Sequence, residues 1–512
     1  MLGYLKRLLT TGAAYQFGDI LAKALALLTL PLYTSHLNPT AYGAAESLLT
    51  AVILSSILLR VGVGEAFIRF YFDDEDVARR ERIARTATAA VALTTTVAAL
   101  ASLALATPLS RLLLGFEDPL LLDCAVLGLW AFTNLEMAYA QLRVDERART
   151  YVFATGANVA LTVSFTIALV VFAHQGARGL LLGNFGASAL VVLALWWVLR
   201  RRVSLRLGRR SLADLRAMLR FGLPTVPADA SVYALQVADR FYLFRSYSHT
   251  SAGLYAVAIK LATVVFVAVR GFQYAWPPLA YSIESDEEAG RLYSLVTTYY
   301  ALATGAVVCA VALLGRWMVH LLAAERFFGA YRALPWLALG WALYGLYLVF
   351  VAIAARARVT SRNVPAALAG LAVNIALLLV LVPGSGAGLG IAGAGIALCG
   401  AYAAMLAVMY LLTRSLFRVG FEWARLAQLA VILIGVAVSG ELLLPASGAL
   451  GLLSRLAWLA LAPAALLLTR FFHPHERDGA RTLIADGRRR VGAFRARHGE
   501  VEAYAEDPLR DL

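Results

Sequence analysis

Long apolar stretches follow one another along almost the whole chain, separated by short polar turns. A helix needs about 20 apolar residues to cross the hydrocarbon core of a bilayer, and most of these stretches have that length. Transmembrane strands would alternate apolar and polar residues over about ten positions, a pattern that the chain lacks. The pattern therefore predicts an all-α polytopic membrane protein with about fourteen transmembrane helices, near 12–34, 41–63, 86–108, 119–142, 151–173, 178–199, 219–244, 251–275, 294–314, 333–355, 363–383, 389–413, 425–444 and 452–471.

Composition agrees with this fold class, because 61% of the 512 residues are hydrophobic and only 15% are charged. So few charges cannot cover a water-facing surface, which excludes a soluble globular protein. A formal net charge of +14 would suit a nucleic-acid-binding protein. However, no basic domain with interleaved aromatic residues carries this charge, and we expect no nucleic-acid partner.

The arginines mark the topology, because they gather in alternate loops. By the positive-inside rule, this asymmetry predicts an even number of spans and two cytoplasmic termini in a multi-pass protein of the cytoplasmic (inner) membrane. Asp19 and Lys23 interrupt the first apolar run and no small-residue cleavage site follows it, so we expect no cleaved signal peptide. Arginine-rich loops lie at 79–85, 143–149 and 200–220, and loops without Lys or Arg lie at 35–40, 383–390 and 444–451.

A weak internal repeat runs through the chain. A register of 210 residues pairs Gly12 with Gly222, Asp19 with Asp229, Gly43 with Gly253, Arg60 with Arg270 and Tyr71 with Tyr281. The overall sequence identity between the two halves at this register is little above chance. The evidence for a repeat is therefore the kind of residue that coincides, namely charged residues and glycines inside predicted spans. The repeat predicts two pseudo-symmetric six-helix lobes, and in transporters built this way the binding site lies between the repeats. We expect an N-terminal lobe (1–205), a C-terminal lobe (206–415), two extra C-terminal helices (416–472) and a polar cytoplasmic tail (473–512).

The first hairpin carries a resemblance to a known family. Its features are Pro31 before Tyr33 and Thr34, the Leu37–Pro39 turn, Tyr42 followed by Gly43, and Gly62 to Arg69 ahead of an acidic loop. The chain resembles the polysaccharide-biosynthesis (Wzx-type) oligosaccharide flippases of the multidrug/oligosaccharidyl-lipid/polysaccharide (MOP) exporter superfamily. This resemblance implies two six-helix lobes plus two further helices, and a lipid-linked oligosaccharide as the substrate.

Polar residues form stripes along the predicted membrane helices. Asp229, Tyr233, Gln236 and Arg240 fall within about 60 degrees on one helix face, and Gln16, Asp19 and Lys23 share a face of the first span. Glu46 and Arg60 lie on nearly one face of the second span. Charges in a bilayer usually face a partner or a wet cavity, so we expect these side chains to line a cleft between the lobes. The alternative is that they are ion pairs that only lock helices together.

The chain uses lysine three times, as Lys6, Lys23 and Lys260, and two of these lie in predicted spans. An ammonium group binds phosphate as a compact point charge. We therefore hypothesise a cationic site for a lipid-linked diphosphate, formed by Lys23, Arg60, Lys260 and Arg270. For Arg60 and Arg270 the alternative is ordinary snorkelling toward the inner membrane surface.

Buried carboxylates are candidates for coupling transport to an ion gradient. Proton or Na⁺ occupancy of a carboxylate in a low-dielectric cleft can bias the side to which the cleft opens. The candidates are Asp19, Glu46, Asp229, and also Glu65 and Asp239. Asp19 and Asp229 stand out because the repeat pairs them, although Asp19 could simply neutralise Lys23.

Enzymatic chemistry finds little support in the sequence. We find no Ser/His/Asp set, no zinc-ligand spacing and no P-loop, and a glycine-rich match at 388–393 lacks the preceding strand that a dinucleotide site needs. A polysaccharide-assembly enzyme would need catalytic residues in a large loop, and the sizeable outer loop at 315–332 offers only His320 and Glu325. We expect no enzyme, no metal and no cofactor beyond a coupling H⁺ or Na⁺.

These features favour a flippase that moves a polyprenyl-diphosphate-linked oligosaccharide across the membrane by ion-coupled alternating access, for cell-surface polysaccharide synthesis. A cation-coupled multidrug antiporter and a peptidoglycan-precursor (lipid II) flippase of the same superfamily remain the alternatives. An antiporter of cationic drugs needs an acidic or aromatic pocket, whereas here basic residues share the expected cleft. Expected partners are the lipid-linked oligosaccharide, membrane lipids and other polysaccharide-assembly proteins.

Overall fold

The computed structural model describes residues 23–72, 76–200, 202, 208–223, 226–283, 285–357, 359–416 and 419–473. Throughout these residues the chain is helical, with no strand, and the predicted all-α class is confirmed. Twelve of the described helices are long and apolar enough to cross a membrane. The chain divides into two compact units, Met1–Phe421 and Glu422–Leu512, which are described separately.

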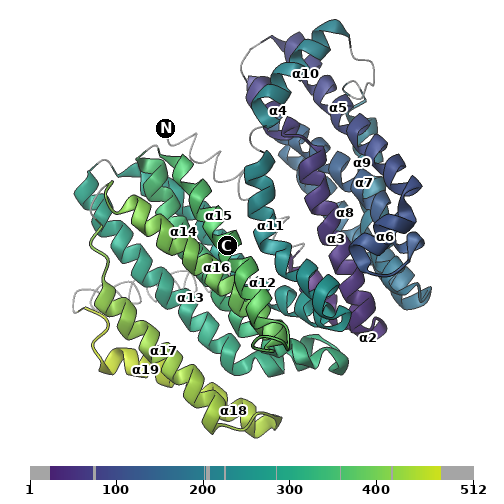
Figure 1. Cartoon of the computed structure of the whole chain (residues 1–512). Coiled ribbons are helices and arrows are strands. Elements are labelled where there is room, and N and C mark those ends of the chain that lie inside the picture. The colour runs from purple at the N-terminus through teal and green to yellow at the C-terminus, as the bar shows by residue number, and fades with distance from the viewer. Residues whose placement is uncertain are drawn as a thin grey trace, which may run out of the picture. The chain divides into compact units, whose positions relative to one another are not determined.

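Unit 1 begins with a group of helices that pack mainly on α7 and α9 (Figure 1). Asn38 caps α3 by accepting a hydrogen bond from the backbone N–H of Ala41 at 2.7 Å, and Pro39 occupies the first helical turn, as an N-terminus favours. The Leu-Asn-Pro turn thus starts the second predicted span. The group consists of α2 (Leu30–His36), α3 (Pro39–Leu59), α4 (Val63–Phe72), α5 (Val77–Ala104), α6 (Ala106–Leu114), α7 (Pro119–Val144), α8 (Ala148–Ile167) with the π-helical turn η1 (Ala168–Phe172), α9 (Gly176–Val198) and α10 (Arg209–Gly222).

A second group in unit 1 packs mainly on α14 and α16 (Figure 1). Ser248 caps α12 by accepting a hydrogen bond from the backbone N–H of Ser251 at 3.3 Å. This group consists of α11 (Val226–Tyr242) with the π-helical turn η3 (Leu243–Tyr247), α12 (His249–Ser282), α13 (Asp286–Leu322), the 3-10 helix η4 (Glu325–Arg332), α14 (Leu334–Arg356), the 3-10 turn η5 (Thr360–Arg362), α15 (Asn363–Leu381) and α16 (Gly390–Thr413). Helices α3 and α11 link the two groups, because α3 packs on α12 and α11 packs on both α3 and α15.

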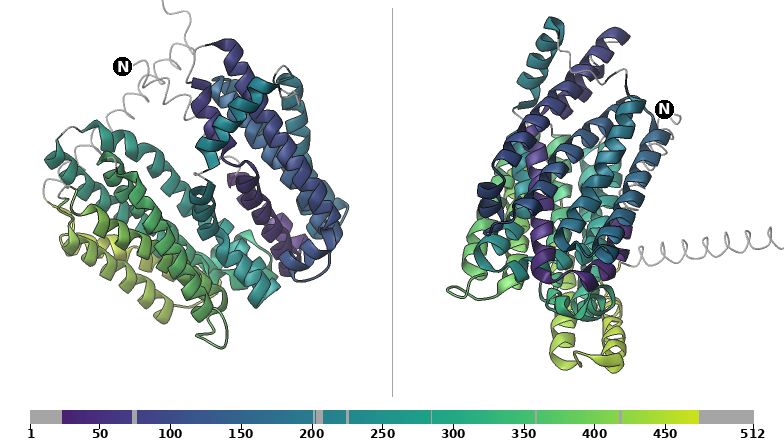
Figure 2. Two further views of the ribbon diagram at one scale, coloured as in Figure 1. Left: turned by 45° about the horizontal axis from the view of Figure 1, so that its top comes forward. Right: turned by 90° about the vertical axis from the view of Figure 1, so that its right-hand side faces the viewer.

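At one end of the first group, α4 and α10 pack against each other (Figure 1). Figure 2 shows the same group of helices from two other sides. Met218 of α10 is fully buried among Phe67 of α4 and Ile83 of α5. The ion pair between Arg82 and Asp214, at 2.8 Å, adds a polar contact between α5 and α10. The arginine-rich loop predicted at 200–220 therefore contains most of a helix, α10, that packs on the first group.

Unit 2 contains α17 (Trp423–Leu443), α18 (Gly448–Leu459) and α19 (Leu461–Leu468). The side chain of Arg455 in α18 is fully buried and pairs with Glu441 of α17 at 2.5 Å. This ion pair fixes α18 against α17, because an unpaired charge in such surroundings would be costly. The predicted last span is correct in position, but it is built from two consecutive helices, with a change of direction at Ala460.

Twelve of the predicted spans correspond to the twelve candidate membrane helices. The first, at 12–34, falls largely outside the described residues. The seventh is wrong at its start, because α10 occupies 209–222 and α11 begins only at Val226, which leaves a helix of 17 residues. The outer loop predicted at 315–332 is also mostly helical, since α13 extends to Leu322 and η4 follows it. The division of unit 1 into two repeated lobes stays a prediction.

Candidate functional site

Helices α3 and α12 touch where each of them begins. A methyl group built on Gly253 would lie 1.9 Å from the carbonyl oxygen of Pro39, and one on Gly43 would lie 2.8 Å from the carbonyl oxygen of His249. The hydroxyl oxygens of Thr40 and Thr250 are 3.1 Å apart and share a hydrogen bond. Glycine at both positions lets the two backbones meet, as small residues do where membrane helices pack closely.

The contact is reciprocal, because Gly43 faces the backbone of His249 and Gly253 faces the backbone of Pro39. The partners Thr40 and Thr250 are 210 residues apart, which is the register of the internal repeat. Reciprocal contacts of this kind are the mark of a two-fold relationship between interacting surfaces. The α3–α12 contact therefore lies on a local pseudo-two-fold axis, on the side that the arginine distribution predicts to be outward.

A second set of contacts lies on the same side of unit 1. The backbone N–H of Ala324 donates to the hydroxyl of Thr34 at 3.0 Å, and Nε of Arg326 donates to the carbonyl oxygen of Thr34 at 3.1 Å. Arg326 also donates to the carbonyl oxygen of Ser35. These bonds tie the segment between α13 and η4 to the end of α2, next to the start of α3. In the described residues, the predicted outward side is therefore closed by two sets of contacts.

About one to two helical turns along α3 and α12 from their close contact lies an ion pair between two residues for which the sequence predicted separate roles. Nζ of Lys260 on α12 is 2.5 Å from Oε1 of Glu46 on α3. Glu46 is only 6% exposed, and the ammonium group also lies 5.1 Å from the ring centre of Tyr42. Lys260, predicted to bind diphosphate, and Glu46, predicted to couple an ion, thus meet directly in this conformation.

Helix α11 brings a second cation to the same part of α3. Nη1 of Arg240 donates to the hydroxyl of Thr50 at 3.0 Å, and that hydroxyl donates to the carbonyl oxygen of Glu46 at 2.8 Å. The Nε atom of Arg240 is buried and has no hydrogen-bond partner among the described residues. Arg240 therefore lies beside Glu46 with one donor still unused.

Asp239 and Tyr255 complete this charged cluster. Asp239 is 1% exposed, and its carboxylate accepts hydrogen bonds from the hydroxyl of Tyr255 and, at 2.8 Å, from the backbone N–H of Arg240. We call Glu46, Asp239, Arg240 and Lys260 the α3–α11–α12 charge cluster. Its two carboxylates and two cations come from α3, α11 and α12, so the cluster balances in charge while it links three helices.

Two further predicted cations meet at one aromatic ring. Nζ of Lys23 and Cζ of Arg270 each lie 4.9 Å from the ring centre of Phe266. Nη1 of Arg270 donates to Oε1 of Gln273 at 3.1 Å, and Phe266 packs against Trp341 of α14 with ring centres 4.5 Å apart. Each cation is attracted by the negative face of the aromatic ring. Lys23 and Arg270 are thus brought together by tertiary structure.

The other predicted site residues are spread more widely. Arg60 lies at the end of α3 and lines a cavity of about 180 Å³ with Gly62 and Glu65. Tyr233 is half-buried on α11. The side chains of Asp229 and Gln236 on the same helix, together with Gln16 and Asp19, fall outside the described part of the structure. Sequence reasoning missed Phe266, Tyr42 and Thr50 as site residues, and only the Tyr42–Glu46 spacing of one helical turn could have signalled any of them.

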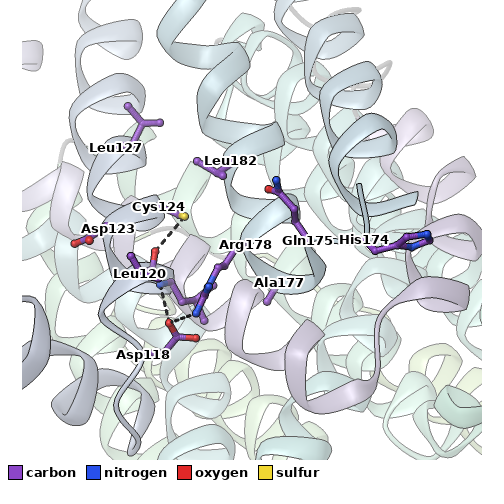
Figure 3. A pocket seen from close by; sticks show the side chains of 11 residues that line it. Asp118, Leu120, Asp123, Cys124, Leu127, His174, Gln175, Ala177, Arg178 and Leu182 are labelled. Atoms are coloured by element: carbon purple, nitrogen blue, oxygen red, sulfur yellow. Dashed lines mark hydrogen bonds and ion pairs between the residues drawn. The ribbon is translucent and has the colours of Figure 1, made fainter. Parts of the chain in front are cut away.

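A separate cavity of about 780 Å³ lies between the start of α7 and the start of α9. Figure 3 shows Asp118 joined to Arg178, with an ion-pair distance of 2.9 Å, and His174 turned away from them. Asp118 also caps α7 through the backbone N–H of Leu121. This arrangement is explained by helix capping, and no group of three metal-ligating side chains occurs among the residues searched, which are those that the structure describes.

On the predicted cytoplasmic side, a polar cluster joins α4 to the turn after α7. The hydroxyl of Tyr71 donates to Asp145 at 2.8 Å, and Nη1 of Arg202 donates to the same carboxylate at 2.7 Å. Burial, followed by the hydrogen bond to Asp145, raises the pKa of Tyr71 above its usual value. These contacts tie α4 and Arg202 to the turn after α7.

The chain is similar to known proteins in sequence and in fold. A family model described as "Polysaccharide biosynthesis protein" matches residues 36–332. No curated protein sequence matches the chain. The fold is similar to that of "Lipid II flippase MurJ, inward closed conformation", with a TM-score of 0.64 at 12% identity over 90% of this chain and 98% of that one.

Two further solved structures share the fold. One is an inward-facing multidrug resistance MATE transporter of the MOP superfamily, with a TM-score of 0.62 at 16% identity over 77% of this chain and 95% of that chain. The other is a MOP superfamily transporter from Pyrococcus furiosus, reported to have a binding pocket of reversed polarity, with a TM-score of 0.55 at 16% identity over 79% and 94% of the two chains. The fold is that of MOP-type transporters.

Proposed function

This chain belongs to the polysaccharide biosynthesis protein family, and we propose that it is a flippase that carries a polyprenyl-diphosphate-linked oligosaccharide across the cytoplasmic membrane. Transport would proceed by alternating access between the two helix groups of unit 1, driven by an H⁺ or Na⁺ gradient. Both termini would lie in the cytoplasm, as the arginine distribution indicates. The proposed activity moves a substrate without breaking a bond, so it requires no catalytic residue and no cofactor.

The observation that carries this proposal is the row of cations below the closed outward side. Along α12, Lys260 lies about 10 Å and Arg270 about 25 Å beyond Gly253 at the usual helical rise. Lys23 meets Arg270 at Phe266. Cations inside a membrane bundle are costly and commonly serve a substrate pathway. Their spacing along one helix suits an anionic head group that enters from the cytoplasmic side and moves outward.

Buried carboxylates keep one alternative open. Glu46 and Asp239 would suit the positively charged substrates of a cation-coupled multidrug antiporter. A lipid II flippase would use the cations in the same way as an oligosaccharide flippase, since both substrates carry a lipid-linked diphosphate. In the Glu46–Lys260 pair the two charges cancel. Arg270, whose Nε atom is buried without a hydrogen-bond partner among the described residues, is what favours an anionic substrate.

The test is a transport assay in proteoliposomes. Fluorescent polyprenyl-diphosphate oligosaccharide, fluorescent lipid II and ethidium would each be supplied to the purified full-length protein, with and without H⁺ and Na⁺ gradients. Movement of the oligosaccharide lipid at a rate well above those of the other two would support the proposal. Preferred movement of lipid II or gradient-driven extrusion of ethidium would replace it with the corresponding alternative. Co-purification would identify other polysaccharide-assembly proteins as partners.

A further inference from the structure

The arrangement of Glu46 between two cations has a consequence for substrate binding. In this conformation Glu46 neutralises Lys260 at 2.5 Å. A phosphate group that approaches Lys260 therefore meets a buried carboxylate as well as an ammonium group, and like charges at close range in a low-dielectric site repel strongly. Anion binding at Lys260 thus requires Glu46 to give up this contact.

Arg240 provides the place to which Glu46 can move. Its guanidinium group is held beside Glu46 by the hydrogen-bond chain from Nη1 through the Thr50 hydroxyl to the carbonyl oxygen of Glu46, with distances of 3.0 and 2.8 Å. Its Nε atom is buried without a hydrogen-bond partner among the described residues. A buried charged donor without an acceptor is unfavourable, so an arriving carboxylate would be stabilised there.

We propose that Glu46 is an exchangeable counterion, which pairs with Lys260 in the absence of substrate and passes to Arg240 when a phosphate group takes its place on Lys260. The inference rests on the proposed function, because it assumes that a lipid-linked phosphate is the substrate. No proton and no covalent bond is transferred. The step replaces one carboxylate–ammonium contact by a phosphate–ammonium contact and a carboxylate–guanidinium contact.

The three residues of the proposed exchange lie on helices that pack together. Glu46 is on α3, and Lys260 on α12 and Arg240 on α11 belong to two helices that both pack on α3. Asp239 does not compete for Glu46's new partner, because its carboxylate is already bound by the hydroxyl of Tyr255 and by a backbone N–H group. Tyr42, on the same helix as Glu46, places its ring 5.1 Å from Nζ of Lys260.

The exchange also weakens the closure of the outward side. The Glu46–Lys260 pair joins α3 to α12 about one to two helical turns from the Gly43–Gly253 contact. When Glu46 moves to Arg240, α3 and α12 lose this ionic contact and keep the contacts at their outer ends and the apolar packing between them. Phosphate binding at Lys260 thus breaks an ionic contact between α3 and α12 and favours opening of the outward side.

The experiment measures the affinity of the purified full-length protein for polyprenyl diphosphate, in a cycle of Glu46→Gln, Arg240→Gln and the double variant. Glu46→Gln removes the carboxylate that competes with the phosphate, and it should tighten binding of polyprenyl diphosphate about tenfold. Arg240→Gln removes the cation to which Glu46 moves, and it should weaken binding about tenfold. In the Glu46→Gln background, Arg240→Gln should have no effect, because no carboxylate needs a new partner. Glu81→Gln, on an exposed surface of α5, is the matched control and should change nothing.

Each other outcome is informative. If Arg240→Gln weakens binding equally in both backgrounds, Arg240 contacts the phosphate itself and the exchange is wrong. If Glu46→Gln leaves the affinity unchanged or lowers it, Glu46 does not compete with the substrate and the exchange is also wrong, while the proposed function survives through the binding of the lipid. If the wild type does not bind polyprenyl diphosphate at all, both the proposed function and the exchange are wrong. Thermal stability of each variant in detergent identifies any that misfolds, and Arg240→Lys, which keeps the charge, should then bind like the wild type.

Discussion

The hydroxyl groups of Thr40 and Thr250 share a hydrogen bond of 3.1 Å, although the two residues are 210 positions apart in the chain. The same interval separates the two glycines that let α3 and α12 meet beside them. A sequence register and a spatial contact thus coincide at one point. This contact closes the predicted outward side, and in the proposed alternating-access cycle it has to open for the substrate to be released.

Removal of one of these glycines should disturb the closure. Gly253→Ala places a methyl group 1.9 Å from the carbonyl oxygen of Pro39, so the two helices cannot approach as they do here. We expect a loss of transport of at least about tenfold, with normal insertion of the protein, as measured in the proteoliposome assay. Gly271→Ala on the same helix meets no atom within 4 Å and should transport normally. Equal activity of the two variants would show that the close contact is not needed.

Removal of Lys260 should destabilise the protein through Glu46. Lys260→Met removes the ammonium group from a buried carboxylate and leaves Arg240 as its neighbouring cation. The expected cost is about 2 kcal/mol, below the usual range for buried pairs because the lysine side chain is 26% exposed and Arg240 remains. The double variant Glu46→Gln/Lys260→Met should recover most of this loss. Thermal unfolding in detergent would measure both effects. Additive losses in the double variant would mean that the two residues act independently.

Arg270 should be important for transport rather than for stability. Arg270→Gln removes one of the two cations at Phe266 and keeps a side chain that can hydrogen-bond, so we expect transport of the oligosaccharide lipid to fall about tenfold or more with little change in thermal stability. Arg291→Gln, an exposed position on α13, is the control for loss of a positive charge. A similar loss in both variants would point to membrane-surface charge instead of a site.

Tyr71 should contribute to the stability of the predicted cytoplasmic side. Tyr71→Phe removes the hydrogen bond to Asp145, which should cost about 1 kcal/mol. Because the pKa of Tyr71 is raised in the folded protein, its contribution is present below the unfolded pKa of about 10 and decreases as the pH rises through the folded value. Thermal unfolding between pH 8 and pH 11 should therefore show a steeper alkaline loss in the wild type than in Tyr71→Phe. Parallel curves would exclude Tyr71 as the titrating group.

The sequence predicted the fold well wherever local pattern decides the structure. Apolar length located the spans, and the Leu-Asn-Pro turn placed the start of α3, because both signals depend on neighbouring residues. The start of α11 was wrong, since the amphipathic helix α10 carries enough apolar residues to extend a predicted span. Individual site residues such as Glu46 and Lys260 were recognised as unusual charges. Their pairing, and the meeting of Lys23 with Arg270 at Phe266, depend on tertiary contacts between distant helices and have no local signal.

The most direct test of alternating access through the α3–α12 contact is reversible locking of that contact. In a protein whose buried cysteines Cys124, Cys309 and Cys399 have been replaced by alanine, Thr40→Cys and Thr250→Cys would allow a disulfide to form across it. We predict that oxidation stops movement of the fluorescent polyprenyl-diphosphate oligosaccharide and that reduction restores it, while either single variant is insensitive to oxidation. If the oligosaccharide lipid still crosses the membrane at an undiminished rate with the disulfide in place, the α3–α12 contact is not the gate and the account is wrong.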